Sequence, residues 1–563
     1  MYFDFTIPIP QIKGKLYRNK IKETTYICYE FDRTYNKDKK YNTPKRTSIG
    51  KVNPSATNMM FPNPKYYEFF PEDSIPMLQE TQERSCCLKV GAYLVIKKII
   101  EDYDLISILN KYFESKEVGL FLDLVSYSLI EENNAGQYYP DYAYNHPLFS
   151  DAMHIYSDTT VSRFLHSITI EQSTGFLNEW NTNRDHREKI YISYDATNKN
   201  CQSGDIDLAE YGEAKADKSK PIFNYAVAYD KTNREPLFYE DYPGSIVDVS
   251  QLECMLGKAK EYGYRNVGFI LDRGYFSKDN IRYMDHEGYN FVIMVKGMSK
   301  LVNGIILENK NTFEDVRKFH VHGTKTYGIT VKSKLYNSDM KSRYFHLYYS
   351  PGKNSYQRSD LEKKLERMKR TIEKLRGKTE VELSESYLEY FEPIYYEPDH
   401  TFLMAKEREK VIENELKLCG YFCIITSEKM TADDALHLYK SRDCSEKLFR
   451  GDKSYLGNRS LRVGSQETAE AKIFVEFVAM IVRNRLYTYL MDEVKRIGQR
   501  ENYMTVPAAI KELEKIEMVR VNSGKYKLDH AVSATQKAIL KSFGIEESHI
   551  KQRCKEISDG LYS

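Results

Sequence analysis

The sequence lacks the features that would place the protein in a membrane or make it a zinc-binding protein. Its most apolar stretch, residues 473–482, is interrupted by Glu476 and is too short to cross a bilayer. No apolar segment follows a basic one at the N-terminus, so no secretory signal is predicted. The nine cysteines form no repeated CxxC pair, and no histidines stand at zinc-finger spacing. We therefore expect a soluble, cytoplasmic protein with reduced cysteines and no membrane partner.

The chain also lacks an overall excess of charge, since the formal net charge is +2 over 563 residues. With 41% hydrophobic and 29% charged residues, it can form sizeable cores and several domains. The balance is uneven, because residues 1–55 hold twelve Lys or Arg against five Asp or Glu. These basic residues are interleaved with tyrosines, a composition that suits a phosphate backbone and stacked bases. A solvated extension that keeps the protein soluble explains the same composition, and both interpretations remain open.

A hydrophobic periodicity of three and four predicts helices from about residue 83 to residue 183. Apolar side chains recur at this spacing over residues 90–100, and residues 120–133 form a second helical segment. Ser157 precedes a third segment as its predicted N-cap. The pattern predicts an all-helical module, but by itself it does not indicate what that module binds.

From Lys189 onward the period changes to two, which predicts strands. Three strands come first, and alternating helices and strands follow them, as in a mixed sheet flanked by helices. The expected strands cover residues 189–195, 222–229, 235–242, 266–272 and 289–295, and the expected helices cover residues 250–262 and 277–287.

Residues 298–418 interrupt this alternation. Two strand-like segments, 326–333 and 343–349, precede a strongly helical one, and Ser359 and Glu362 form its predicted capping box. An amphipathic surface helix explains the segment better than a basic helix that tracks DNA. Its apolar residues are spaced by four and three: Leu361, Leu365, Met368, Ile372 and Leu375.

Two aspartates end predicted strands of the mixed sheet. Asp195 closes residues 189–195, and Asp272 closes residues 266–272. An aspartate at the end of an apolar strand lies at the carboxyl edge of the sheet, where ligand sites of such sheets form. One such residue is commonly only a turn or cap residue, whereas two in the same sheet are a stronger indication of a site. For two further acids, Asp230 and Asp248, a turn is the simpler interpretation.

A third element lies farther along the chain, where Thr431 is the predicted N-cap of a helix. Tyr439, Arg442 and Glu446 follow, spaced by three and then four, which places them on one helix face. Lys453 comes seven residues after Glu446, near or beyond the helix end. From charge alone, a solvated, salt-bridged helix face is the better explanation.

The order of these elements resembles a large branch of the DDE-class transposases of bacterial insertion sequences. The resemblance covers roughly residues 189–462, from the strand of Asp195 through the strand of Asp272 and a long insertion to the helix. A Pro243-Gly244-Ser245-x2-Asp248 pattern is also similar to that branch. The set of residues that carries the resemblance is Tyr439-x2-Arg442-x3-Glu446-x6-Lys453.

The resemblance implies a multidomain α/β protein with a ribonuclease H-like mixed sheet and flanking helices. A β-rich plus helical insertion would interrupt this core, and a helical N-terminal module would precede it. The implied domains are a basic N-terminal arm (1–75), a helical DNA-end-binding module (76–186), the first part of the core (187–297), the insertion (298–418), the second part of the core with the signature helix (419–500) and a C-terminal helical tail (501–563).

The resemblance also implies the chemistry of the site. Asp195, Asp272 and Glu446 would be the catalytic acids and would bind two Mg²⁺ ions, for which Mn²⁺ can substitute. Two hard cations activate the attacking oxygen and stabilise the leaving one, and carboxylates suffice to hold them. Tyr439, Arg442 and Lys453 would contact phosphates of the DNA.

The implied function is cut-and-paste transposition in the bacterial cytoplasm, in association with the nucleoid. The protein would bind the terminal inverted repeats of its element, hydrolyse phosphodiester bonds at the ends and join the 3′-hydroxyls to target DNA. Cleaving two ends together calls for a homodimer on double-stranded DNA, with helices at residues 468–494 and 507–518 helping to form it. The alternatives are a catalytically inactive, transposase-derived DNA-binding protein and a ribonuclease H-like nuclease.

One departure from the branch concerns tryptophan. Relatives stack a flipped base on a tryptophan of the insertion, but the only tryptophan here is Trp180, upstream of the core. Tyr421 and Phe422 are aromatic candidates for this role, and the sequence does not choose between them. A hairpin intermediate is therefore a less secure expectation than metal-dependent nicking.

Overall fold

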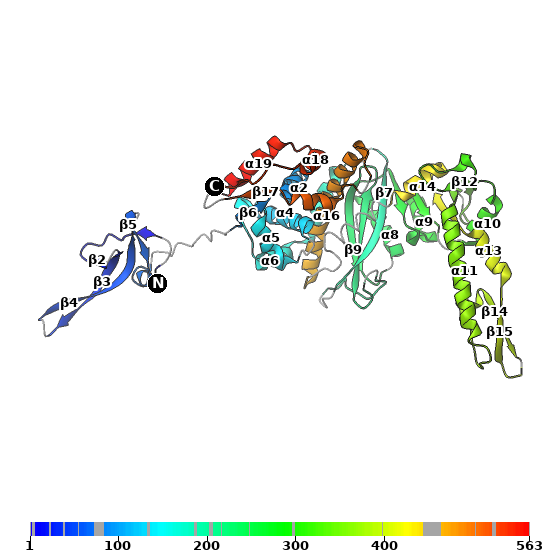
Figure 1. Cartoon of the computed structure of the whole chain (residues 1–563), viewed down its shortest axis with the longest axis horizontal. Coiled ribbons are helices and arrows are strands. Elements are labelled where there is room, and N and C mark those ends of the chain that lie inside the picture. Colours follow the sequence, from blue (N-terminus) through cyan, green and yellow to red (C-terminus); the bar gives the residue numbers. More distant parts are fainter. Residues whose placement is uncertain are drawn as a thin grey trace. The chain divides into compact units, whose positions relative to one another are not determined.

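The computed structural model divides the chain into two compact units, Met1–Glu83 and Arg84–Ser563 (Figure 1). Within the part of the chain that it describes, no helix is long and apolar enough to span a bilayer. The described residues are 2, 6–21, 24–37, 40–54, 56–71, 84–131, 135–184, 188–201, 206–214, 217–246, 248–295, 299–339, 341–396, 398–442, 463–500, 503–520 and 525–561.

The first unit is a five-stranded antiparallel sheet in the order β1-β5-β4-β3-β2, followed by one short helix. A small core of Ile27, Ile49, Met60 and Tyr66 holds it together. The sequence predicts no strands in this region, because much of β3 and β4 is exposed and therefore shows no apolar alternation. The elements are β1 (Ile7–Pro8), β2 (Leu16–Ile21), β3 (Thr24–Asn36), β4 (Tyr41–Asn53), β5 (Ala56–Pro62) and α1 (Pro64–Phe69).

The second unit begins with the predicted helical module. Ser157 caps its helix as predicted, because the side chain accepts a hydrogen bond from the backbone N–H of Thr160. A small sheet joins this module to the C-terminal region through the strand order β18-β17-β6. The elements are β6 (Cys87–Lys89), α2 (Gly91–Asp102), α3 (Leu105–Leu109), α4 (Ser115–Ile130), α5 (Tyr139–Asn145), α6 (Asp158–Ser167), α7 (Ile170–Thr182), β17 (Glu517–Val519) and β18 (Lys527–Leu528), with short 3-10 turns at Gly136–Tyr138 and Asp151–Met153.

The centre of the second unit is an eight-stranded mixed sheet in the order β12-β13-β16-β11-β10-β7-β8-β9. The three strands β7, β10 and β11 are parallel, and their neighbours pair antiparallel. The expected mixed α/β architecture is therefore confirmed. The strands are β7 (Ile190–Asn200), β8 (Ile222–Asp230), β9 (Glu235–Pro243), β10 (Val267–Leu271), β11 (Asn290–Met294), β12 (Tyr327–Ser333), β13 (Arg343–Tyr349) and β16 (Tyr421–Thr426).

Helices cover both faces of this sheet. Neighbouring residues of β9 point to opposite faces, and Phe238 contacts Tyr262 directly after α8, while Tyr239 contacts Phe477 of α16. Helix α14 packs against β10, β11, β13 and β16. The helices are α8 (Asp248–Glu261) and α9 (Lys278–Glu287) on one face, with α14 (Ala432–Lys440) and α16 (Gln466–Arg496) on the other.

The region between β11 and β16 divides into two parts. Strands β12 and β13 extend the central sheet, whereas β14 and β15 form a separate hairpin that packs with α11 (Figure 1). The predicted capping box at Ser359 is wrong, because α11 begins eight residues earlier, at Pro351, with Ser350 as its N-cap. Proline presets the helical φ at this first position. The elements are α10 (Ser299–Asn309), α11 (Pro351–Glu373), α12 (Glu385–Leu388), β14 (Phe391–Tyr396), β15 (Thr401–Glu407) and α13 (Glu409–Leu418), with a 3-10 turn at Arg317–Phe319.

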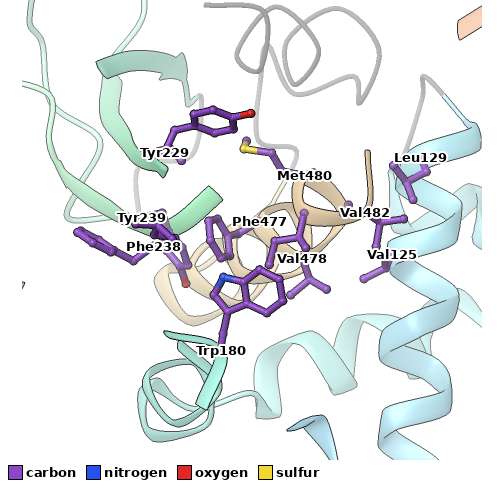
Figure 2. Packing of buried hydrophobic residues seen from close by; sticks show 14 of the residues in the cluster. Val125, Leu129, Trp180, Tyr229, Phe238, Tyr239, Phe477, Val478, Met480 and Val482 are labelled. Carbon is purple, nitrogen blue, oxygen red and sulfur yellow. The ribbon is translucent and has the colours of Figure 1, made fainter. Parts of the chain in front are cut away.

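The long helix α16 runs through the interior, and its buried residues lie all around it. Trp180 is completely buried among residues of β9 and α16 (Figure 2), and its indole N–H donates to the Pro236 carbonyl at 2.9 Å. Most residues of α16 are buried within one chain, and the dimer role expected from the sequence stays a prediction. The expected helix 507–518 is shorter than predicted, because its last residues form β17. The C-terminal helices are α17 (Val506–Leu513), α18 (Ala534–Ser542) and α19 (Glu547–Gly560).

Candidate active site

Asp195 lies inside β7 rather than at its end, because this strand continues to Asn200 through antiparallel pairing with β8. On its other side β7 pairs in parallel with β10, and that ladder stops at the pair Tyr194 and Leu271. Asp195 is therefore the first residue beyond the parallel ladder. The prediction of a strand end is wrong for β7 itself but holds for its pairing with β10.

Asp272 follows the last residue of β10 and is likewise the first residue beyond the parallel ladder. Because aligned residues of neighbouring strands point to the same face, Asp195 and Asp272 share one edge and one face of the sheet. The turn after Asp272 is held by Tyr275, whose N–H donates to the Asp272 carbonyl at 3.0 Å. The Tyr275 ring is buried, with its centroid 5.5 Å from that of Tyr194. Packing thus fixes where Asp272 emerges.

Helix α14 brings the signature residues to this edge. Thr431 accepts the N–H of Asp434 at 3.1 Å, which confirms the predicted N-cap. Leu436 and Tyr439 are buried against the sheet face that carries Asp272. The helix ends at Lys440, and a turn follows in which the N–H of Arg442 donates to the Tyr439 carbonyl at 3.2 Å. The described helix therefore ends before Arg442, which the sequence analysis had placed within it.

Tyr439 and Arg442 both contact the carboxylate of Asp272. The Arg442 Nη1 lies 3.0 Å from Asp272 Oδ1, and the Tyr439 hydroxyl donates to the same oxygen at 3.4 Å. Burial raises the pKa of Tyr439 to about 12, against an opposing effect of Arg442. Tyr439 therefore stays protonated at neutral pH and acts as a hydrogen-bond donor. Two of the signature residues thus converge on one of the predicted acids.

Glu446 and Lys453 lie outside the described residues. Both fall between α14 and α16, and these two helices pack on the sheet face that carries Asp195 and Asp272. In the described part of the chain, no three His, Cys, Asp or Glu side chains are grouped to hold a metal ion. The two aspartates supply hard oxygen ligands of the kind Mg²⁺ prefers, and a third acid is needed to complete the predicted set.

The positive charge at Asp272 bears on how a cation would bind there. Arg442 is 16% exposed and Asp272 is 36% exposed, so their ion pair lies at the border of the solvent. A metal ion at this carboxylate would use its other oxygen or displace the guanidinium, since like charges repel at this range. The donor types fit a divalent cation, and Arg442 is the group that would have to move or share.

Other residues weighed from the sequence have structural roles. Asp230 caps the turn after β8, accepting the N–H groups of Thr232 at 2.7 Å and Asn233 at 3.1 Å, as predicted. The neighbouring Asn198 donates to the Glu213 carbonyl at 2.9 Å. The side chain of Asp248 lies outside the described residues.

Gly244 of the Pro-Gly-Ser pattern is required by close packing. A Cβ atom at this position would lie 2.1 Å from the carbonyl oxygen of Ile222 and 2.6 Å from that of Glu210. Gly244 also donates its N–H to the Leu208 carbonyl at 3.3 Å. The glycine therefore lets the loop before β8 pack against the end of β9.

The two aromatic candidates of the insertion boundary are packed side chains. Phe422 stacks on Tyr348 with ring centroids 4.9 Å apart, and Tyr421 contacts Tyr349 and donates to Glu314. A residue that the sequence analysis did not single out, Lys353, places its ammonium 4.7 Å from the Phe422 ring centroid. Burial and then the charge of Arg273 lower the pKa of Lys353. No sequence pattern connects Lys353 to Phe422, because the contact depends on how α11 meets the sheet.

Comparison with known proteins adds the family. The family model described as a transposase DDE domain matches residues 188–482, which is more than half of the chain. This chain belongs to that family. The DDE domain thus begins just before β7 and ends within α16, so it includes Asp195, Asp272, Tyr439 and Arg442.

Two further comparisons add little to this assignment. A cryo-EM structure of the piggyBac transposase synaptic complex with hairpin DNA is similar over 88% of this chain and 80% of that one. The identity is 9% and the TM-score is 0.33. No curated protein sequence matches the chain. The assignment to the transposase DDE domain family therefore depends on the family model.

Proposed function

We propose that this protein is a DNA transposase that cleaves the ends of its element and joins them to target DNA. The observation that carries the proposal is the convergence of Tyr439 and Arg442 on Asp272, one strand away from Asp195. Membership in the transposase DDE domain family supports the same chemistry. The cut-and-paste pathway, the terminal inverted repeats as substrate and the bacterial cytoplasm as location are parts of this proposal.

The catalytic core is of the ribonuclease H-like type in this proposal. Support comes from five adjacent strands in the order β9-β8-β7-β10-β11, of which only β8 runs against the others. The two acids lie on the central parallel strands β7 and β10, where ligand sites of such sheets form. The position of Asp195 and Asp272 on these strands supports their proposed role as acids of a metal-dependent nuclease.

Each residue has a separate role in the proposed site. Two Mg²⁺ or Mn²⁺ ions, when bound, would activate the attacking oxygen and stabilise the leaving one. Asp195, Asp272 and Glu446 would hold these ions through hard oxygen atoms. Arg442 would exchange its contact with Asp272 for a bidentate contact to a DNA phosphate.

Two further roles and the assembly complete the proposal. The protonated Tyr439 would donate a hydrogen bond to the DNA backbone, and Lys453 would add a point charge beside it. Both ends of an element must be cut together, so the active form is a homodimer on double-stranded DNA. Because α16 is buried, the contacts between its subunits would come from other surfaces or from the DNA.

The test uses the purified full chain, Mg²⁺ or Mn²⁺, and a plasmid that carries the gene with its own flanking DNA. We expect the wild-type protein to excise and rejoin the flanked segment, and we expect Glu446→Gln and Asp272→Asn to bind DNA without cutting it. Glu413→Gln is the matched control, because Glu413 lies on the exposed surface of α13 and pairs only loosely with Lys417 at 3.5 Å.

The same assay separates the alternatives. A protein that cuts without joining would be a ribonuclease H-like nuclease acting on another substrate. A wild type that binds DNA and behaves like both variants would be a transposase-derived DNA-binding protein. Either outcome would overturn the proposal.

A further inference from the structure

The first unit contains a two-stranded ribbon that extends beyond its sheet. Strand β2 pairs with β3 only as far as Tyr29, and β5 pairs with β4 only from Gly50 onward. Between these limits β3 and β4 pair only with each other, from the contact of Glu30 with Arg46 to that of Asn36 with Tyr41. The term ribbon is used below for residues 31–37 and 40–47.

The base of the ribbon is fixed by ion pairs and ring contacts. Glu30 is 5% exposed and binds both Arg33 at 2.6 Å and Arg46 at 3.1 Å. The Arg46 guanidinium also lies 3.7 Å from the ring centroid of Tyr17. Phe31 stacks on Phe69 with centroids 5.3 Å apart. These contacts hold the direction of the ribbon relative to its own sheet.

Beyond this base, both faces of the ribbon are solvent-exposed. Tyr35 is 58% exposed and Tyr41 is 54% exposed, although tyrosine is a residue that usually buries most of its ring. An isolated two-stranded hairpin is only marginally stable in water. An exposed ribbon that is anchored so firmly at its base is therefore suited to being covered by a partner.

Charge indicates which partner fits. The described residues of the first unit include eleven Lys or Arg but only three Asp or Glu. Two of the acids, Glu30 and Asp32, are paired with cations at the base of the ribbon. The cations are Lys13, Lys15, Arg18, Lys20, Arg33, Lys37, Lys40, Lys45, Arg46, Lys51 and Lys65. This excess favours a polyanion, and the absence of an apolar tip among the described residues disfavours a lipid surface.

The dimensions fit the major groove of duplex DNA. That groove is about 12 Å wide and admits a two-stranded β-ribbon. At about 3.3 Å per residue, the seven residues 31–37 span about 20 Å, enough to follow part of one turn. Thr34 pairs with Thr43, and Tyr35 with Asn42, so both strands carry hydroxyl or amide groups, one pair on each face of the ribbon. Such groups bind base edges, while the lysines suit phosphates.

We propose that the ribbon enters the major groove and recognises the base sequence of the DNA that the transposase acts on. The inference rests on the proposed function, because it assumes a duplex DNA substrate. It assigns sequence recognition to a unit outside residues 188–482, the part matched by the DDE domain. Chemistry and recognition would then belong to separate parts of the chain.

The experiment is selection of bound sequences from a pool of random 30-base-pair duplexes, using the full chain. One variant replaces residues 34–43 with Asn-Gly, which closes a tight hairpin directly after the pair Arg33 and Pro44. A second variant, T34A/Y35A/N42A/T43A, keeps the length of the ribbon but removes its polar groups. The control K13A/K65A removes two charges of the same unit outside the ribbon, and thermal unfolding checks that each variant folds.

We expect the wild type and K13A/K65A to enrich one sequence motif and to bind it at least about tenfold more tightly than unselected duplex. Guanine N7 atoms in that motif should be protected from methylation, since N7 lies in the major groove. Both ribbon variants should lose the motif and the protection while retaining salt-dependent binding to any duplex.

Several outcomes would overturn the inference. They are a wild type that enriches no motif, ribbon variants that enrich the same motif with unchanged affinity, and protection confined to the minor groove. Binding of the wild type to anionic lipid vesicles in place of duplex DNA would assign the ribbon to another partner. None of these results touches the excision assay with Glu446→Gln, so failure of the inference and failure of the proposed function are distinguishable.

Discussion

Two ion pairs on the same face of the central sheet each join a cation to a carboxylate, but they differ in position and burial. Arg442 and Asp272 meet at the edge, with side chains 16% and 36% exposed. Lys199 and Glu476 meet at 2.8 Å between β7 and α16, with side chains 0% and 1% exposed. Lys199 shares its face of β7 with Asp195, because residues four apart in a strand point the same way.

The difference teaches that burial decides which pair is available for chemistry. The Lys199 ammonium also lies 4.7 Å from the ring centroid of Tyr225, so it is enclosed on several sides. Separating this pair would leave a charge without water around it, which costs several kcal/mol. Arg442 can leave Asp272 at a lower cost, because this pair borders the solvent. The buried pair therefore joins α16 to the sheet, whereas the edge pair is the one that supplies ligands in the proposed function.

The largest effect should come from Asp272→Asn at the edge. We expect strand cleavage to fall by at least about a thousandfold, which is ~4 kcal/mol in the barrier. Stability should hardly change, because the lost ion pair is partly exposed. The measurements are the cleavage rate on plasmid DNA and the thermal unfolding of the same preparation. A cleavage rate of Asp272→Asn within tenfold of the wild-type rate would show that Asp272 is not a catalytic residue.

Glu476→Gln should show the opposite behaviour at the buried pair. It leaves Lys199 charged and unpaired by Glu476, which should lower the free energy of unfolding by about 3–5 kcal/mol. Lys199→Met combined with Glu476→Leu should recover most of that loss, since the two apolar side chains fill similar volumes. Denaturant unfolding measures both. Glu413→Gln, which breaks an exposed pair with Lys417, is the control and should change little. If Glu476→Gln lowered the free energy of unfolding as little as Glu413→Gln, burial would not explain the difference between the two pairs.

The two ion pairs also differ in how well the sequence predicts them. The N-cap at Thr431 was predictable from a local pattern, but Arg442 lies in the turn after α14 and not on the helix face expected from its spacing. The family resemblance implied that the side chains of Tyr439 and Arg442 contact DNA phosphates, and their contact with Asp272 was not predicted. Nothing local connects Lys199 with Glu476, which are 277 residues apart in the chain. The long-range pair became visible only in the folded molecule.

Most strands and helices of the second unit were predicted because their apolar residues alternate or recur. The end of β7 was not, since residues 197–200 are polar and resemble a loop. They are buried instead through β8 and through contacts such as that of Asn200 Nδ2 with the Asp217 carbonyl at 2.9 Å. The strands of the first unit were missed for the reverse reason, because much of β3 and β4 is exposed. Polar strands without a buried face carry no period to detect.

Asp123 extends the comparison to a buried carboxylate whose hydrogen-bond donors include backbone N–H groups. Asp123 is 1% exposed, and its carboxylate accepts the N–H groups of Phe149 at 2.5 Å and Ser150 at 3.3 Å. Burial raises the pKa of Asp123 to about 7, and these hydrogen bonds oppose the shift. The fold thus favours the protonated form, whereas the unfolded chain releases the proton near pH 3.9.

The sign of the pH dependence follows from that raised pKa. The contribution of Asp123 to stability is complete below about pH 3.9 and is lost as the pH rises to about 7. Relative to Asp123→Asn, the unfolding free energy of the wild type should fall over this window, by at most about 1.4 kcal/mol per pH unit. Denaturant unfolding at pH 4, 5, 6 and 7 measures the difference. A constant difference between the two proteins would show that Asp123 does not titrate in this range.

The smallest effect is expected from replacing Arg442, the cation of the edge pair. Arg442→Gln removes a positive charge 3.0 Å from an oxygen of Asp272. A divalent cation at this carboxylate would then meet less repulsion, so Mn²⁺ should bind about fivefold more tightly, which is ~1 kcal/mol. The same change should weaken binding to duplex DNA, because one phosphate contact is lost.

Calorimetric titration with Mn²⁺ and DNA-binding curves at two salt concentrations test both halves of this last prediction. Arg442→Lys is the matched variant, since it keeps the charge but loses the planar fork that binds two oxygens at once. It should bind Mn²⁺ like the wild type and DNA less tightly. If Arg442→Gln left the affinity for Mn²⁺ unchanged, the guanidinium and the metal would not share Asp272. The edge pair would then be a structural contact like Lys199 and Glu476, in spite of its exposure.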